Sequence, residues 1–173
     1  MMFYGGGGVT FTGGEATLQM DELIELTQGL KESGIHTALE TNGTSGRLWE
    51  LLPYIDYLMM DFKHYDSEIL KKYTGIGNEQ VKRNYEYICG MQRQIHIRIP
   101  LINGINTCHP EGFAAYLAAY PNPNAVYEFL AYHEYGKEKW KEAYQVQDGF
   151  VSQETIRSFK DVFEKYGLKT VTT

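Results

Sequence analysis

Short runs of β-branched and aromatic residues alternate along the chain with longer segments whose apolar residues recur every three to four positions. Val9–Thr12, with glycines on both sides, is typical of a short buried strand. The helical period follows over residues 20–31, and Gly34 stands beyond its end as a stop signal. The opening of the chain therefore predicts one strand followed by one amphipathic helix.

The same alternation continues to the end of the chain. Further strands are predicted at 36–40, 57–61, 94–99, 125–130 and 169–172, and further helices at 48–52, 78–91, 110–120 and 153–166, the last with Ser152 as its N-cap. Strands that alternate with helices through short loops form parallel βαβ units, which close into a barrel or wind into an open sheet. In either architecture the ligand site lies at the carboxyl ends of the strands.

Composition narrows the class of protein. The 173 residues fit one domain, 43% are hydrophobic, and no apolar run is long enough to cross a bilayer. The net charge of −6 is spread along the chain, which argues against a nucleic-acid partner. The chain shows no leader-like segment, and two cysteines make no disulfide framework. We therefore expect a cytoplasmic globular protein with neither membrane nor nucleic acid as partner.

Polar residues and glycines lie at the ends of the first five predicted strands. They are Gly13, Gly14, Glu15, Glu40, Thr41, Asp61, Lys63, Arg98, Tyr132 and His133. Carboxylates, cations and a histidine on one rim suit a zwitterionic ligand, with backbone groups freed by the glycines closing around it. Taken singly, each has a structural explanation: Glu15 as a helix cap, Glu40 or Asp61 with Lys63 as an ion-pair network, Arg98 as a paired cation, and His133 as a core residue.

The order of these strand ends resembles a known family. Gly13-Gly14-Glu15 is similar to the glycine-glycine-glutamate element of radical S-adenosylmethionine enzymes, and the wider string 7–16 resembles the second strand of activating enzymes of the pyruvate formate-lyase type. Segments 39–43, 55–63, 72–75, 97–106, and 130–133 with 136–140, resemble the following elements of the same enzymes. Five ordered motifs at five successive strand ends rarely recur by chance.

The resemblance implies an incomplete (β/α)6 partial TIM barrel whose first strand is missing. It implies that S-adenosylmethionine and a [4Fe–4S] cluster generate a glycyl radical on a partner such as pyruvate formate-lyase, with flavodoxin or ferredoxin as electron donor. Gly13, Gly14 and Glu15 are then expected to hold the methionine amino group, and Lys63 and Arg98 other polar parts of the ligand. His133 is expected near the ribose, and Tyr132 is the one tyrosine expected to contact the adenine.

One departure from the family concerns the cluster. The chain contains Cys89 and Cys108, and neither begins the CxxxCxxC spacing that binds the cluster in the family. We therefore expect a fragment that lacks the cluster motif and is inactive alone. The strand at 9–12 is then expected to lie at an open edge of the sheet and to promote self-association.

Other departures and alternatives stay open. Glu40 stands where the family commonly has aspartate, and Ala131 where it has proline. The oxygens of Glu40, Thr41 and Asp61 are also of the kind that hold a small cation. One alternative function is a cluster-free module that binds an adenosyl ligand. Another is an unrelated β/α barrel enzyme that uses Asp61 and Lys63 as an acid/base pair.

Overall fold

The protein is a single curved sheet of six parallel strands. The computed structural model describes residues 7–135, 146 and 148–172. The strands are β1 (Gly8–Phe11), β2 (His36–Thr41), β3 (Tyr57–Asp61), β4 (Ile95–Leu101), β5 (Ala125–Ala131) and β6 (Thr170–Val171). They lie in the sheet in the order in which they occur in the sequence, each parallel to its neighbours. The predicted α/β partial barrel is confirmed, and its parallel sheet is open, as expected for an incomplete barrel.

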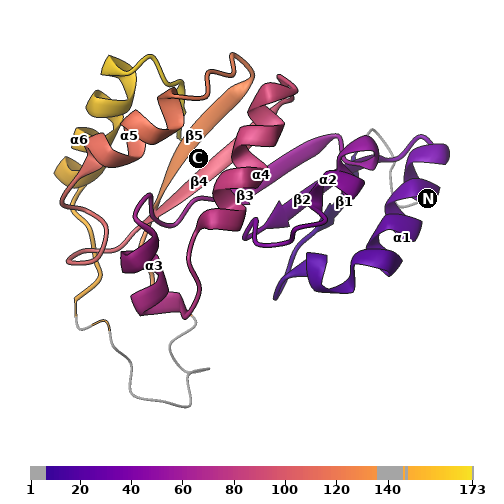
Figure 1. Ribbon diagram of the computed structural model, residues 1–173, viewed down its shortest axis with the longest axis horizontal. Helices are drawn as coiled ribbons and strands as arrows, with labels where there is room; N and C mark the ends of the chain where they lie inside the picture. The colour runs from indigo at the N-terminus through magenta and orange to yellow at the C-terminus, as the bar shows by residue number, and fades with distance from the viewer. Residues whose placement is uncertain (1–6, 136–145, 147, 173) are drawn as a thin grey trace.

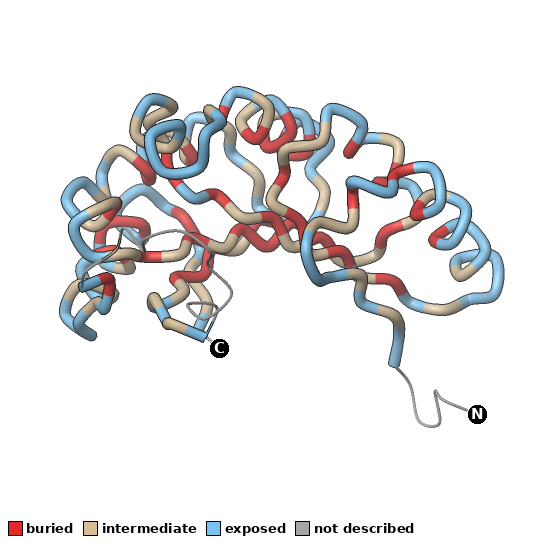
Figure 2. Tube along the Cα trace, turned by 90° about the horizontal axis from the view of Figure 1, so that it is seen from below, coloured by how far each residue is buried: buried red, intermediate tan, exposed pale blue. Residues whose placement is uncertain are grey.

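The helices cover one face of this sheet (Figures 1 and 2). They are α1 (Met20–Glu32), α2 (Leu48–Leu51), α3 (Ser67–Thr74), α4 (Glu79–Gly90), α5 (Pro110–Ala118) and α6 (Gln153–Lys165), with short 3-10 turns at Ala16–Gln19 and Leu52–Tyr54. In Figure 2 they lie along the convex side of the arched sheet, and the concave side carries none of them. All of these except α3 correspond to helices or caps predicted from the sequence.

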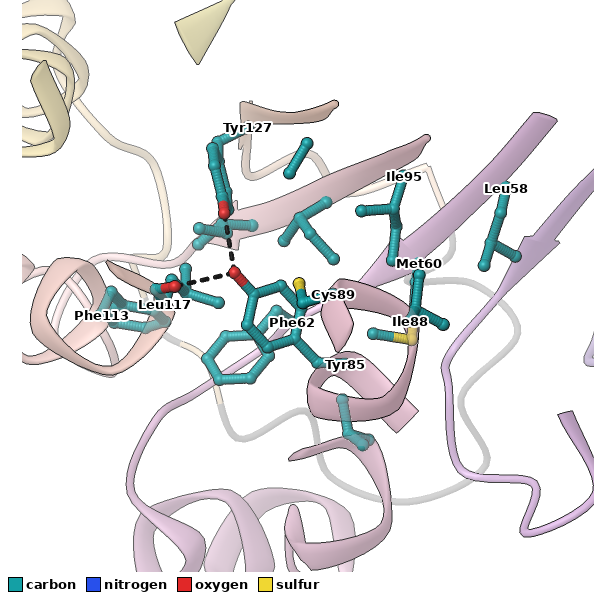
Figure 3. Close-up of a cluster of buried hydrophobic side chains, with 14 of the residues drawn as sticks. Leu58, Met60, Phe62, Tyr85, Ile88, Cys89, Ile95, Phe113, Leu117 and Tyr127 are labelled. Carbon is teal, nitrogen blue, oxygen red and sulfur yellow. Dashed lines mark hydrogen bonds between the residues drawn. The ribbon is translucent and has the colours of Figure 1, made fainter. Parts of the chain in front are cut away.

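Alternation along β4 shows how the sheet separates its two faces. Ile95, Ile97 and Ile99 are fully buried and point toward the helices, whereas His96 and Arg98 point to the concave side. Apolar residues of β3 and β5 join them in a core beneath α4 and α5 (Figure 3). The polar set is thereby left on the concave side, where a ligand can reach it.

Two tyrosines tie the helices to the sheet inside this core. The Tyr85 hydroxyl donates to the Leu117 carbonyl at 2.9 Å and lies 2.7 Å from the Tyr127 hydroxyl (Figure 3). Because the Tyr85 proton points to the carbonyl, Tyr127 donates to Tyr85. Burial raises the pKa of Tyr127 to about 12. Each hydroxyl therefore has a partner in the apolar interior, as buried polar groups require.

The end signals of two helices were predicted correctly. Gly34 adopts a φ of 69° beyond α1, a conformation that favours glycine. The Ser152 side chain accepts a hydrogen bond from the Thr155 amide at the start of α6. In the described part of the chain, no helix is long and apolar enough to span a bilayer.

β1 forms one edge of the sheet. Among the described residues it pairs with β2 alone, over Gly8–Phe11. The strand carries no charged residue and no proline, the features that usually protect an edge. The predicted open edge is therefore present, and self-association through it stays a prediction.

Candidate functional site

A pocket of about 250 Å³ lies at the carboxyl ends of the first four strands. It is lined by Thr12, Gly13, Gly14, Glu15, Glu40, Thr41, Asn42, Asp61, Lys63 and Arg98. Eight of the ten predicted site residues therefore meet in one place. They meet because parallel strands point their carboxyl ends to the same edge of the sheet.

Glu15 joins the ends of β1 and β2. One carboxylate oxygen accepts from the Thr17 amide at 3.2 Å and from the hydroxyls of Thr17 and Thr41 at 2.6 and 2.7 Å. The other accepts from the Asn42 amide at 2.7 Å. Burial raises the pKa of Glu15, but these hydrogen bonds outweigh it and leave the pKa below its ordinary value. Glu15 is thus the N-cap of the turn at Ala16–Gln19, as its structural explanation anticipated, and it lines the pocket as well.

Arg98 joins the ends of β2, β3 and β4. Its Nη2 donates to Glu40 Oε1 at 2.7 Å and to Asp61 Oδ1 at 2.8 Å. The hydrogen bond from Arg98 lowers the pKa of Glu40, and Thr12 adds a smaller effect in the same direction. Burial lowers the pKa of Arg98, but the two carboxylates outweigh it and raise the pKa above its ordinary value. The guanidinium therefore occupies the position between the carboxylates where a cation was considered.

Lys63 is held less tightly than Arg98. Its Nζ lies 3.8 Å from Asp61 Oδ2, beyond hydrogen-bond distance, and its side chain is 44% exposed against 15% for Arg98. Lys63 therefore presents a positive group to the open side of the pocket.

The two glycines differ in what they contribute. Gly13 has a φ of 91°, which side chains rarely adopt, whereas Gly14 has no positive φ. A Cβ built at either position meets no atom within 4 Å, so both point into open space beside the pocket. The positive φ at position 13 favours glycine, whereas Gly14 leaves space beside the pocket that a side chain would occupy.

Tyr132 and His133 lie apart from this pocket. Tyr132 packs edge-on against Phe150, with ring centroids 5.4 Å apart. His133 is exposed, stacks on Tyr135 at 4.5 Å, and lines a separate hollow of about 350 Å³ between β5 and α6. The segment 136–140, part of the resemblance, lies outside the described residues.

Two lining residues were missed by the sequence prediction. Asn42 donates its amide to Glu15, and its side-chain oxygen accepts from the amide and hydroxyl of Thr44. Thr12 approaches Glu40. The Asn42-Gly43 pair signalled a turn, and Gly43 has a φ of 71°, but a turn signal does not show which group the freed amide meets.

The cysteines do not meet at the site. Cys89 is buried in α4, where burial raises the pKa of its thiol, and Cys108 is exposed in the loop before α5. Within residues 7–135, 146 and 148–172, no three His, Cys, Asp or Glu side chains are arranged to hold a metal ion. With two cysteines in the whole sequence, this chain does not fit a three-thiolate cluster site.

The fold and the pocket define a class of protein: an open parallel α/β barrel with a charged ligand site at its strand ends. The sequence model of the Radical SAM superfamily matches residues 2–117. The chain belongs to the radical SAM superfamily.

Its relatives point to one branch of that superfamily. The chain is 33% identical to the pyruvate formate-lyase 1-activating enzyme of Escherichia coli K12 over 96% of this chain and 71% of that enzyme. It is 32% identical to the choline trimethylamine-lyase activating enzyme of Oleidesulfovibrio alaskensis, over 79% of this chain and 46% of that enzyme. The predicted resemblance to activating enzymes of this type is confirmed, and an unrelated barrel enzyme is excluded.

A solved structure matches almost from end to end. It is a domain of the pyruvate-formate lyase-activating enzyme from Bacteroides vulgatus, with a TM-score of 0.81 and 26% identity. The match covers 97% of this chain and 99% of that one.

Proposed function

We propose that this chain is the part of a glycyl radical enzyme activating enzyme that binds S-adenosylmethionine. The observation that supports the proposal most directly is the charge of the strand-end pocket. Glu15, Glu40 and Asp61 supply three carboxylates there, and Lys63 and Arg98 supply two cations. S-adenosylmethionine carries a sulfonium, an ammonium and a carboxylate, so its net charge of about +1 complements a pocket with one excess negative charge.

Each pocket residue has a role in this proposal. Lys63 attracts the carboxylate of the ligand, because its ammonium is exposed and only loosely paired. The backbone at Gly13 and Gly14 meets the amino group, and Glu15 holds that backbone against β2. Arg98 lowers the pKa of Glu40 and holds the carboxylates of Glu40 and Asp61 in place, so the pocket is preformed when the ligand is absent.

The chemistry that the ligand supplies in this family is hydrogen abstraction after its reductive cleavage at a [4Fe–4S] cluster. The two cysteines of this chain do not fit the cluster, and we assign no electron-transfer step to these residues. The chain spans 46% of the choline trimethylamine-lyase activating enzyme and 71% of the Escherichia coli enzyme. The cysteine content also favours a second candidate, a cluster-free module that binds the adenosyl ligand alone.

The partner follows from the relatives. Their names describe activators of pyruvate formate-lyase and choline trimethylamine-lyase. We propose a glycyl radical enzyme of the pyruvate formate-lyase type as the partner, with flavodoxin or ferredoxin as electron donor. Pairing through the β1 edge is proposed as a route to self-association, and a monomeric elution profile at high protein concentration would contradict it.

Amide chemical-shift mapping with S-adenosylmethionine tests the binding proposal, since it detects millimolar affinity. Shifts are expected at Gly13–Glu15, Glu40–Asn42 and Lys63. S-adenosylhomocysteine, which lacks the sulfonium charge, serves as the matched ligand and is expected to bind more weakly. Shifts outside the pocket, or equal affinity for both ligands, contradict the proposal.

Anaerobic reconstitution with iron and sulfide tests whether this chain can hold a cluster, which the cluster-free candidate forbids. This chain is expected to bind no stoichiometric iron, because it lacks the three thiolates. A stable four-iron spectrum would show that the chain holds a cluster by other ligands and would remove the cluster-free candidate.

A further inference from the structure

The backbone that carries Lys63 leaves the sheet at the pocket. The Phe62 amide still donates to the Arg98 carbonyl at 2.8 Å, continuing the pairing of β3 with β4. Two residues further along β4, Pro100 has no N–H to offer. The N–H that would meet the Phe62 carbonyl is therefore missing, and the ladder between the two strands ends here. The Lys63 carbonyl lies beyond this end and takes its donor from a side chain.

The side chain of Asn106 supplies that donor. Its Nδ2 donates to the Lys63 carbonyl at 3.1 Å and to the Pro100 carbonyl at 2.6 Å. Its Oδ1 accepts from the Ile102 amide at 2.8 Å, which fixes the direction of the amide plane. Asn106 is 4% exposed, so water does not readily replace it. A primary amide is one of the few neutral groups whose two protons can satisfy two adjacent carbonyls.

A second asparagine holds the next carbonyl. Asn78 precedes α4 and is 1% exposed, yet its side chain makes no capping hydrogen bond to that helix. Its Nδ2 donates to the His64 carbonyl at 2.8 Å. The Lys63–His64 segment is thus fixed through two successive carbonyls by amides from two different parts of the chain.

We propose that Asn106 is a positioning residue that acts through Lys63. The ion pair to Asp61 at 3.8 Å is too long to orient the lysine, so the direction of its side chain depends on where the backbone places Cα. Asn106 sets that placement and links it to Pro100 of β4, two residues beyond Arg98. An effect of Asn106 on ligand affinity rests on the role proposed above for Lys63. Its effect on the position of the Lys63 side chain does not.

Asn106→Asp is the most informative test, because aspartate has nearly the same shape as asparagine. It replaces the two hydrogen bonds from Nδ2 by contacts between a carboxylate oxygen and two carbonyl oxygens. Asn84→Asp is the matched control. Asn84 is 7% exposed, and its Nδ2 bridges the Gly43 and Ser45 carbonyls at 2.8 and 2.9 Å. Both variants lose the same kind of buried bridge, but only Asn106 touches the Lys63 backbone.

The first measurement needs no ligand. The lysines are methylated reductively with ¹³C, and the Lys63 signal is assigned from Lys63→Arg and from its shift in Asp61→Asn. In folded Asn106→Asp the signal is expected to move to the position of fully exposed lysines and to lose its response to Asp61→Asn. In Asn84→Asp it is expected to stay at the wild-type position. A wild-type signal in folded Asn106→Asp, or an equal shift in both variants, overturns the proposal.

Asn106→Ser covers the case in which Asn106→Asp does not fold. Serine keeps one donor, and the Lys63 signal is expected between the two extremes; a wild-type signal there also overturns the proposal. The second measurement is the affinity for S-adenosylmethionine, expected to fall about tenfold in Asn106→Asp, as for one lost hydrogen bond. If the wild type binds no S-adenosylmethionine, the proposed function fails while the lysine signal still decides the role of Asn106.

Discussion

The strand ends on the two sides of the sheet differ in how they are held. At the ends of β1 to β4, charged side chains bind one another across strands, and Glu15 and Arg98 each connect two or more strands. At the end of β5, Tyr132 and His133 contact aromatic rings close in sequence or in the following loop, and neither lines the charged pocket. The ends of β1 to β4 thus carry a preformed charged network, and the end of β5 carries aromatic contacts outside it.

This difference follows from the register of the strands. Asp61 lies directly opposite Arg98, and Glu40 lies opposite Met59, two residues before Asp61. Side chains in such positions are close enough to form hydrogen bonds without a ligand. Tyr132 and His133 follow the last residue of β5. The Tyr132 amide still donates to the Leu101 carbonyl of β4 at 3.2 Å, but neither side chain lines the charged pocket. The ends of β1 to β4 therefore form a charged network without a ligand. The side chains at the end of β5 would join this site only through a ligand long enough to contact both.

Arg98→Ala is expected to have the largest effect on this comparison. It leaves Glu40 and Asp61 facing each other without their shared cation, and we expect the free energy of unfolding to fall by about 2 to 3 kcal/mol. Urea denaturation measures the change. Arg47→Ala is the matched control, because Arg47 also binds two carboxylates, those of Asp21 and Glu50, but at the exposed surface. An equal loss in both variants would show that the pocket network is no stronger than a surface one.

Glu15→Gln ranks second. Loss of the charged cap is expected to cost about 1 kcal/mol at neutral pH. Because the pKa of Glu15 is lower in the folded protein, its stabilising effect is fully present above its ordinary value of 4.5 and is lost as the pH falls through the lower folded value. The stability difference between wild type and Glu15→Gln should therefore shrink below pH 4.5. A difference that stays constant down to the acid transition would contradict the hydrogen bonds assigned to this carboxylate.

The two glycines of the pocket give an effect no larger than that of Glu15→Gln, and they form a matched pair. Gly13→Ala is expected to destabilise the fold by about 1 kcal/mol, because alanine is strained at a φ of 91°. Gly14→Ala should leave stability unchanged and weaken S-adenosylmethionine binding, since the added methyl lies beside the pocket. Thermal unfolding and shift mapping report the two quantities. If Gly14→Ala were the more destabilising variant, the roles assigned to the two glycines would be reversed.

Much of the fold was predictable, because it depends on local pattern. Strand and helix bounds follow from the apolar period, which the core confirms at Ile95, Ile97 and Ile99. The exception is α3, an eight-residue helix with no buried residue, whose apolar positions Ile69, Leu70 and Tyr73 are too few to establish a period. Its signals were of another kind: the Asp66 side chain accepts from two amides at its start, and Gly75 has a φ of 81° at its end. Caps define such a helix when packing does not.

Most of the residues that line the pocket were predictable from the sequence, whereas their pairing was not. Polar residues at successive parallel strand ends had to converge, so the set from Gly13 to Arg98 was recognisable from order alone. Which carboxylate meets which donor depends on register and rotamer, and the sequence carries neither. Asn106 shows the limit most clearly: it was noticed as part of a motif, but its bridge between the Lys63 and Pro100 carbonyls depends on a loop closing back on two strands.

His133→Ala is the smallest expected effect and the most direct test of the comparison. The side chain is exposed and lies outside the charged network, so unfolding by urea is expected to be unchanged. If S-adenosylmethionine reaches from the pocket to the end of β5, its affinity should fall severalfold in this variant. The affinity for free methionine should stay the same, because methionine lacks the adenosyl group. Tyr135→Ala, which removes the stacked ring and leaves the imidazole, is the control. Equal losses for methionine and S-adenosylmethionine would mean that the β5 end acts on the charged pocket from a distance and that the two sides are one site.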